Sequence, residues 1–69
     1  MPLLSTVALL EGVPEKGLRR GQVGTVVEEL SPGVYEIEFS DDMGHTYAAL
    51  AIAANSLLPL VHEPANRAA

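Results

Sequence analysis

Cysteine and tryptophan are absent from this chain of 69 residues, and aromatic residues make up only 4% of it. Without cysteine there is no disulfide framework and no zinc site built on thiolates, which fits a cytoplasmic location. With so few aromatics, the interior must be built from Val, Leu, Ile and Ala, because 48% of the residues are hydrophobic. A chain of this length forms one domain, and its small core supplies about 3–5 kcal/mol of stability.

Long hydrophobic runs are also missing, because no segment approaches the roughly 20 apolar residues of a membrane span. The opening segment MPLLSTVALLEGVPEK lacks a basic start and a cleavage-site pattern, so we interpret it as a first strand and not as a signal peptide.

Positive charge is scarce, since 4 cations stand against 9 anions and give a net charge of −5. A domain this acidic repels phosphate backbones unless its cations gather on one face.

The β-forming residues and the turn residues predict five short strands. In VYEIEFS, Tyr35, Ile37 and Phe39 alternate with polar residues, as in a strand with one buried face. The strands are expected at 5–11, 22–30, 34–40, 45–52 and 57–61, with turns at 31–33 and 41–44 and a helical turn at 53–56. The alanines leave a helix across 46–54 as the alternative. Pro59 indicates that the last strand lies at an edge.

This layout predicts an all-β fold, a five-stranded SH3-like small barrel over residues 1–62, followed by a disordered tail at 63–69. Val23 and Val26 are three residues apart, so a regular strand would turn them to opposite faces. A β-bulge at Gly24 would bring both inward. The expected core consists of Val7, Leu9, Val23, Val26, Tyr35, Ile37, Phe39, Leu50 and Leu58.

The segment GLRRGQVG (17–24) raises the question of a phosphate-binding loop. Such loops place a helix N-terminus directly after the glycines, whereas a Val-rich strand follows here, so we interpret the segment as a corner of the barrel. Lys16, Arg19 and Arg20 are three of the four cations, and they can contact a partner from this loop. Weak pairing with nearby carboxylates is the alternative.

Most of the acidic residues fall on two neighbouring strands and the turn that follows them. They are Glu28, Glu29, Glu36, Glu38, Asp41 and Asp42. Like charges that face one another across a sheet are destabilising, so this acidic stripe is a candidate docking face for a basic partner, with a solvated barrel face as the alternative.

Asp41, Asp42 and His45 offer too few ligands for calcium or zinc. Ser40, His45 and Asp41 lie too close in sequence to form a catalytic triad in a pocket.

Three segments resemble a family of very short bacterial proteins known only as a domain of unknown function. The segments are VALLEGVPEKGLRRGQVGTVVEEL, PGVYEIEFSDDMGHTYA and LLPL, which together cover roughly residues 6–60. The resemblance implies a stand-alone small barrel and supplies no activity or cofactor. A weaker similarity to the KOW motif of RNA-associated proteins rests on Gly21, Gly24 and Val26, although Glu28 and Glu29 follow where that motif is mainly basic.

These observations predict a non-catalytic protein-interaction or regulatory module, such as an antitoxin-like partner of a larger protein. A KOW-like RNA-binding module is the alternative, and the net charge makes nucleic acid the less favoured partner. We expect no cofactor, no metal and no membrane association, and a monomer or a weak homo-oligomer. The candidate partner-binding residues are Lys16, Arg19, Arg20, Glu36, Glu38, Asp41 and Asp42.

Overall fold

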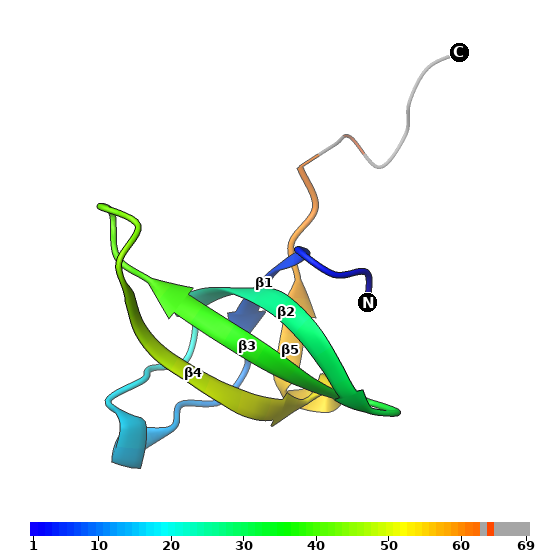
Figure 1. The fold of residues 1–69 in the computed structure, drawn as a ribbon, viewed down its shortest axis with the longest axis horizontal. Helices are drawn as coiled ribbons and strands as arrows, with labels where there is room; N and C mark the ends of the chain where they lie inside the picture. The colour runs from blue at the N-terminus through cyan, green and yellow to red at the C-terminus, as the bar shows by residue number, and fades with distance from the viewer. Residues whose placement is uncertain (63, 65–69) are drawn as a thin grey trace.

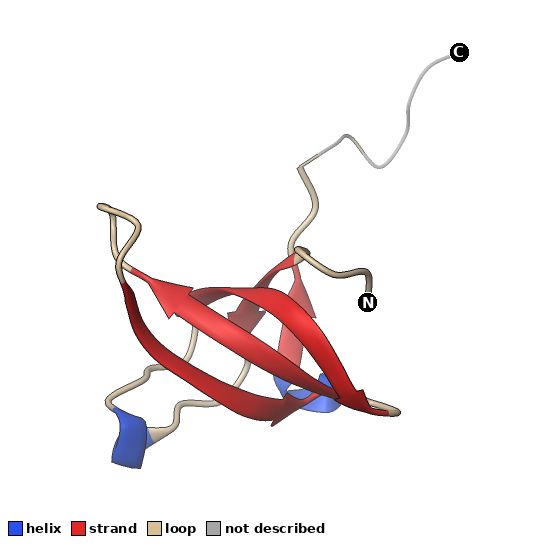
Figure 2. Ribbon diagram, viewed as in Figure 1, coloured by secondary structure: helices blue, strands red, loops and turns tan. Residues whose placement is uncertain are grey.

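The computed structural model describes residues 1–62 and 64, and strands make up most of its ordered elements (Figures 1 and 2). The elements are β1 (Thr6–Leu9), η1 (Pro14–Lys16), β2 (Val23–Ser31), β3 (Val34–Ser40), β4 (Thr46–Ala53), η2 (Ala54–Ser56) and β5 (Leu57–Pro59), where η denotes a 3-10 turn. Because 46–53 is a strand, the alternative of a helix there is excluded. The expected tail at 63–69 lies outside the described residues, except for Pro64.

All five strands form one antiparallel sheet in the order β4-β3-β2-β1-β5. The sheet curls around the core, and its end strands β4 and β5 are not paired with each other (Figure 1). This confirms the predicted five-stranded small barrel with a helical turn before the last strand, and Pro59 does lie in an end strand. The barrel is open, so β4 is left with one free edge.

The buried residues confirm most of the predicted core. Val7, Leu9, Val26, Tyr35, Ile37 and Phe39 are buried, and the partly buried Leu50 packs against them. Val23 and Leu58 were predicted wrongly, because each is 48% exposed. The register explains Leu58: its neighbour Leu57 pairs with the buried Leu9 and therefore takes the inward position.

Gly24 forms no bulge, which corrects the prediction for this strand. Its pairing with Val7 is regular, and the register shifts of β2 against β3 occur farther along, between Val26 and Glu28 and between Glu29 and Ser31. Regular alternation therefore buries Gly24 and Val26 and turns Val23 outward. A Cβ atom at Gly24 would lie 2.6 Å from Ile37 Cγ2 and 2.9 Å from Phe39 Cε1. The glycine is required by the close approach of two core side chains.

The connection between β1 and β2 folds back on itself and contributes to the core. Val13 and Leu18 exchange backbone hydrogen bonds of 2.9 and 3.1 Å on either side of η1. This small hairpin buries Leu18, which is 3% exposed and was not among the predicted core residues. Gly21 turns the chain into β2 with a φ of +88°. The segment 17–24 is thus a corner of the barrel, as predicted.

Candidate functional site

The three cations of the β1–β2 connection are all exposed. Lys16 ends η1, and Arg19 and Arg20 line a hollow of about 470 Å³ together with Gly17 and Gln22. Within residues 1–62 and 64, the one salt bridge joins His45 and Asp41, so Arg19 and Arg20 are free of carboxylate partners there. The weak pairing considered for these cations is absent from this part of the chain.

Gln22 ties this basic loop to the barrel, a role that the sequence did not indicate. Its Oε1 accepts a hydrogen bond of 2.8 Å from the Arg19 backbone N–H, and its Nε2 donates one of 2.7 Å to the Tyr47 hydroxyl. Tyr47 lies on β4, with its ring centroid 6.5 Å from that of Phe39. The loop and the edge strand are therefore joined by one side chain.

Gln22→Ala is expected to raise the hydrogen-exchange rate of the Arg19 amide about fivefold, because a hydrogen bond of this kind contributes about 1 kcal/mol. Tyr47→Phe serves as the matched control, since it removes the bond to Nε2 and leaves the Arg19 bond in place. Hydrogen-exchange rates of the Arg19 amide, measured by NMR, distinguish Gln22→Ala from Tyr47→Phe. Equal rates in the Gln22→Ala variant and the parent would show that this side chain does not hold the loop.

Glu28 of β2 and Glu36 and Glu38 of β3 share the outer face of the sheet, whereas Glu29 pairs with Tyr35, a residue of the core. Glu36 pairs directly with Glu28 of β2 and with Ala51 of β4, and Glu38 pairs with Thr25 and Ala49. Glu36 and Glu38 are both half-buried, and neither has a cationic partner among the described residues. Two carboxylates directly opposite each other destabilise a sheet by a few tenths of a kcal/mol. The outer face thus carries uncompensated negative charge beside a strand of small side chains.

Asp41 holds the β3–β4 turn together. Its Oδ1 accepts hydrogen bonds of 2.9 Å from the backbone N–H groups of Met43 and His45, while Oδ2 lies 3.6 Å from His45 Nδ1. Asp42 is exposed in the same turn. The described residues contain no group of three or more His, Cys, Asp or Glu side chains arranged to hold a metal ion. We assign Asp41 to turn formation, as its place in the sequence indicates.

An apolar row crosses the other half of the outer surface. Ala8 of β1 pairs with Val23 of β2 on one side and with Leu58 of β5 on the other. Residues directly opposite one another point to the same face, so the two half-exposed side chains flank and cover Ala8. Sequence reasoning placed both in the core. In a regular strand, residues three apart point to opposite faces, so a buried Val26 would have indicated an outward Val23.

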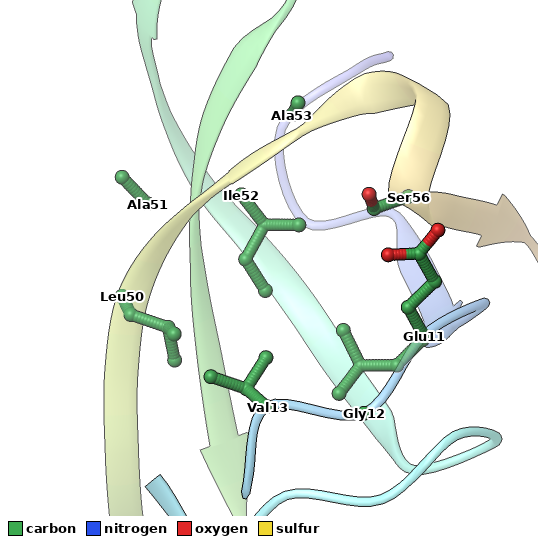
Figure 3. Close-up of a pocket in the computed structure, with 9 residues that line it drawn as sticks. Glu11, Gly12, Val13, Leu50, Ala51, Ile52, Ala53 and Ser56 are labelled. Carbon is green, nitrogen blue, oxygen red and sulfur yellow. The ribbon is translucent and has the colours of Figure 1, made fainter. Parts of the chain in front are cut away.

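A groove runs along the free edge of β4 (Figure 3). It has a volume of about 230 Å³ and is lined by Leu50–Ala53 of β4, by Leu9 and 11–13 of the β1 side, and by Ser56. Leu50 and Ile52 point toward Val13, whereas Ala51 points to the opposite side of the strand (Figure 3). The open seam of the barrel is therefore a mostly apolar groove beside the free edge of β4.

Over residues 1–62 and 64, no helix is both long enough and apolar enough to span a membrane.

A protein-family model matches the chain over all five strands. The model described as "Domain of unknown function (DUF4926)" matches residues 3–59. Comparisons with curated proteins and with solved structures found no match.

Proposed function

We propose that this chain, which belongs to the DUF4926 family, a domain of unknown function, is a non-catalytic protein-interaction module. It binds another protein through the apolar row of Val23, Ala8 and Leu58. An antitoxin-like or regulatory association with a larger protein in the cytoplasm is the form that we favour. The lack of cysteine suits that compartment.

The apolar row carries this proposal. Single exposed hydrophobic side chains are ordinary on protein surfaces, but contiguous exposed apolar groups mark interaction sites. Here two large side chains of different strands are held in register on either side of Ala8, and each keeps 48% of its surface exposed. The strands that hold them are rigid elements of the sheet, so little ordering is needed on binding.

The test is affinity capture from the native cell with the parent and with a Val23→Ser/Leu58→Ser variant. The variant is expected to fold and to lose the captured protein, because exposed substitutions change stability little. Leu30→Ser is the matched control, since Leu30 is 47% exposed but lies at the far end of β2. Equal capture by the variant and the parent would contradict the proposal.

The exposed Arg19 and Arg20 beside their hollow favour a KOW-like RNA-binding module as the second candidate. RNA contacts by cations release counterions, so affinity for single-stranded RNA would fall steeply with salt. Changing Lys16, Arg19 and Arg20 to Ser would then remove this binding and leave stability nearly unchanged. Micromolar binding of RNA by the parent at physiological salt would place this function first.

A further inference from the structure

We infer that the free edge of β4 accepts an extended, basic segment of a partner protein as a sixth strand. Lysine or arginine side chains of that segment would reach Glu36 and Glu38, and its apolar side chains would enter the groove beside Leu50 and Ile52. This surface is separate from the apolar row of β2, β1 and β5, so the inference goes beyond the proposed function, and either can fail alone.

The first observation is that β4 is a long edge strand without protection. It has eight residues, TYAALAIA, and pairs with β3 alone. Proteins usually guard such edges with lysine, proline or very short strands, because the unpaired N–H and C=O groups attract other strands. The opposite end strand is guarded in this way, since β5 has three residues and ends in Pro59. β4 contains neither a charged residue nor a proline.

The second observation is the groove that follows this edge. Ligand pockets for small molecules commonly have about 300–1,000 Å³, and this groove is smaller, at about 230 Å³. It is lined on one side by Leu50–Ala53, with Val13 across from Leu50 and Ile52 (Figure 3). Strand addition uses main-chain hydrogen bonds for affinity and alternate side chains for specificity. A few small apolar side chains of an added strand fit this space.

Charge determines the kind of segment. The register places Ala49 beside Glu38 and Ala51 beside Glu36, so only methyl groups separate the two carboxylates from the free edge. Strands lie about 4.8 Å apart, so an added strand would lie about 10 Å from β3. A long cationic side chain and a glutamate can bridge that gap together across the alanines. Glu28, directly opposite Glu36, strengthens the attraction, and Glu11 adds a carboxylate at the groove.

A second copy of the chain is the less suitable occupant. Its own β4 would bring alanines against alanines and no cation toward Glu36 or Glu38, because TYAALAIA is uncharged. The exposed cations Lys16, Arg19 and Arg20 lie on the β1–β2 connection instead. Charge complementarity therefore favours a basic segment from another protein.

The test uses an acetylated and amidated heptapeptide of alternating lysine and valine, titrated into the full chain and followed by NMR. The largest amide shifts are expected at residues 46–53, with new protection from hydrogen exchange on β4. A heptapeptide of alternating glutamate and valine should cause no shifts. If the lysine peptide shifts the amides around Val23 and Leu58 instead, or none, the inference is wrong.

Two variants that change the net charge equally separate the effect of the acidic face from the effect of net charge. Glu36→Gln/Glu38→Gln is expected to weaken peptide binding at least about tenfold, a loss of about 1.4 kcal/mol. Glu15→Lys changes the net charge by the same two units at the exposed η1 and should leave affinity within about twofold, as expected for a screened charge outside the acidic face. Equal weakening by both variants would overturn the inference.

Ala51→Lys is the edge control, because a lysine on the exposed face of β4 guards an edge strand and lies beside Glu36. It should abolish peptide binding with no loss of stability. If the peptide-free parent sediments as a dimer that Ala51→Lys separates, a second copy occupies the edge, and the inference of a basic partner fails.

Discussion

Gly24→Val is expected to lower the free energy of unfolding by about 2–3 kcal/mol, as overpacking of a well-filled core does. The new Cβ atom alone would lie 2.6 Å from Ile37 Cγ2, and both neighbours are fully buried side chains that cannot move into solvent. Against a core that supplies about 3–5 kcal/mol, this loss leaves a large unfolded population. Urea unfolding at 25 °C measures it.

Thr25→Val is the control for Gly24→Val, since it introduces valine at the next position of β2, on the outer face, without adding side-chain volume. It should change stability by no more than about 0.5 kcal/mol. A second check pairs Gly24→Ala with Ile37→Ala, which removes the Cγ2 atom that the new methyl group meets. The double variant should be more stable than the sum of the single effects predicts. Additive effects would show that Gly24 is not kept small by Ile37.

Leu18→Ala is expected to lower the free energy of unfolding by about 2–4 kcal/mol, although Leu18 lies between two loops in the sequence. The side chain is 3% exposed and belongs to the core cluster, so its truncation leaves a cavity where the β1–β2 connection meets the barrel. The Val13–Leu18 backbone pairing keeps the loop in place and limits its collapse into that cavity.

Leu58→Ala provides the comparison for Leu18→Ala, because it makes the same change at a position expected in the core from sequence and found 48% exposed. Its effect should stay below about 1 kcal/mol. Melting curves of the two variants, recorded together by circular dichroism, show which variant has lost more stability. If Leu58→Ala is the more destabilising, the register of β5 against β1 described above is wrong.

The sequence by itself determined the features that depend on local chemistry. Alternation in VYEIEFS placed Tyr35, Ile37 and Phe39 inside, because the two-residue period of a strand needs no partner to be recognised. Asp41 and Gly44 marked the turn that joins β3 and β4, since a carboxylate can bond the amides that follow it. The two-residue period of β3 also predicted the acidic face, because Glu36 and Glu38 alternate with the buried residues of that strand.

Only the tertiary structure decided the features that depend on two segments meeting. Leu57 and Leu58 are equally apolar, and the pairing with Leu9 chooses which of them is buried. Gly24 is small because Ile37 and Phe39, more than ten residues away, approach it across the sheet. The apolar row and the free edge of β4 likewise exist only once strand order and register are set. A one-residue slip in register exchanges the two faces of a strand, so these choices cannot be made from one strand alone.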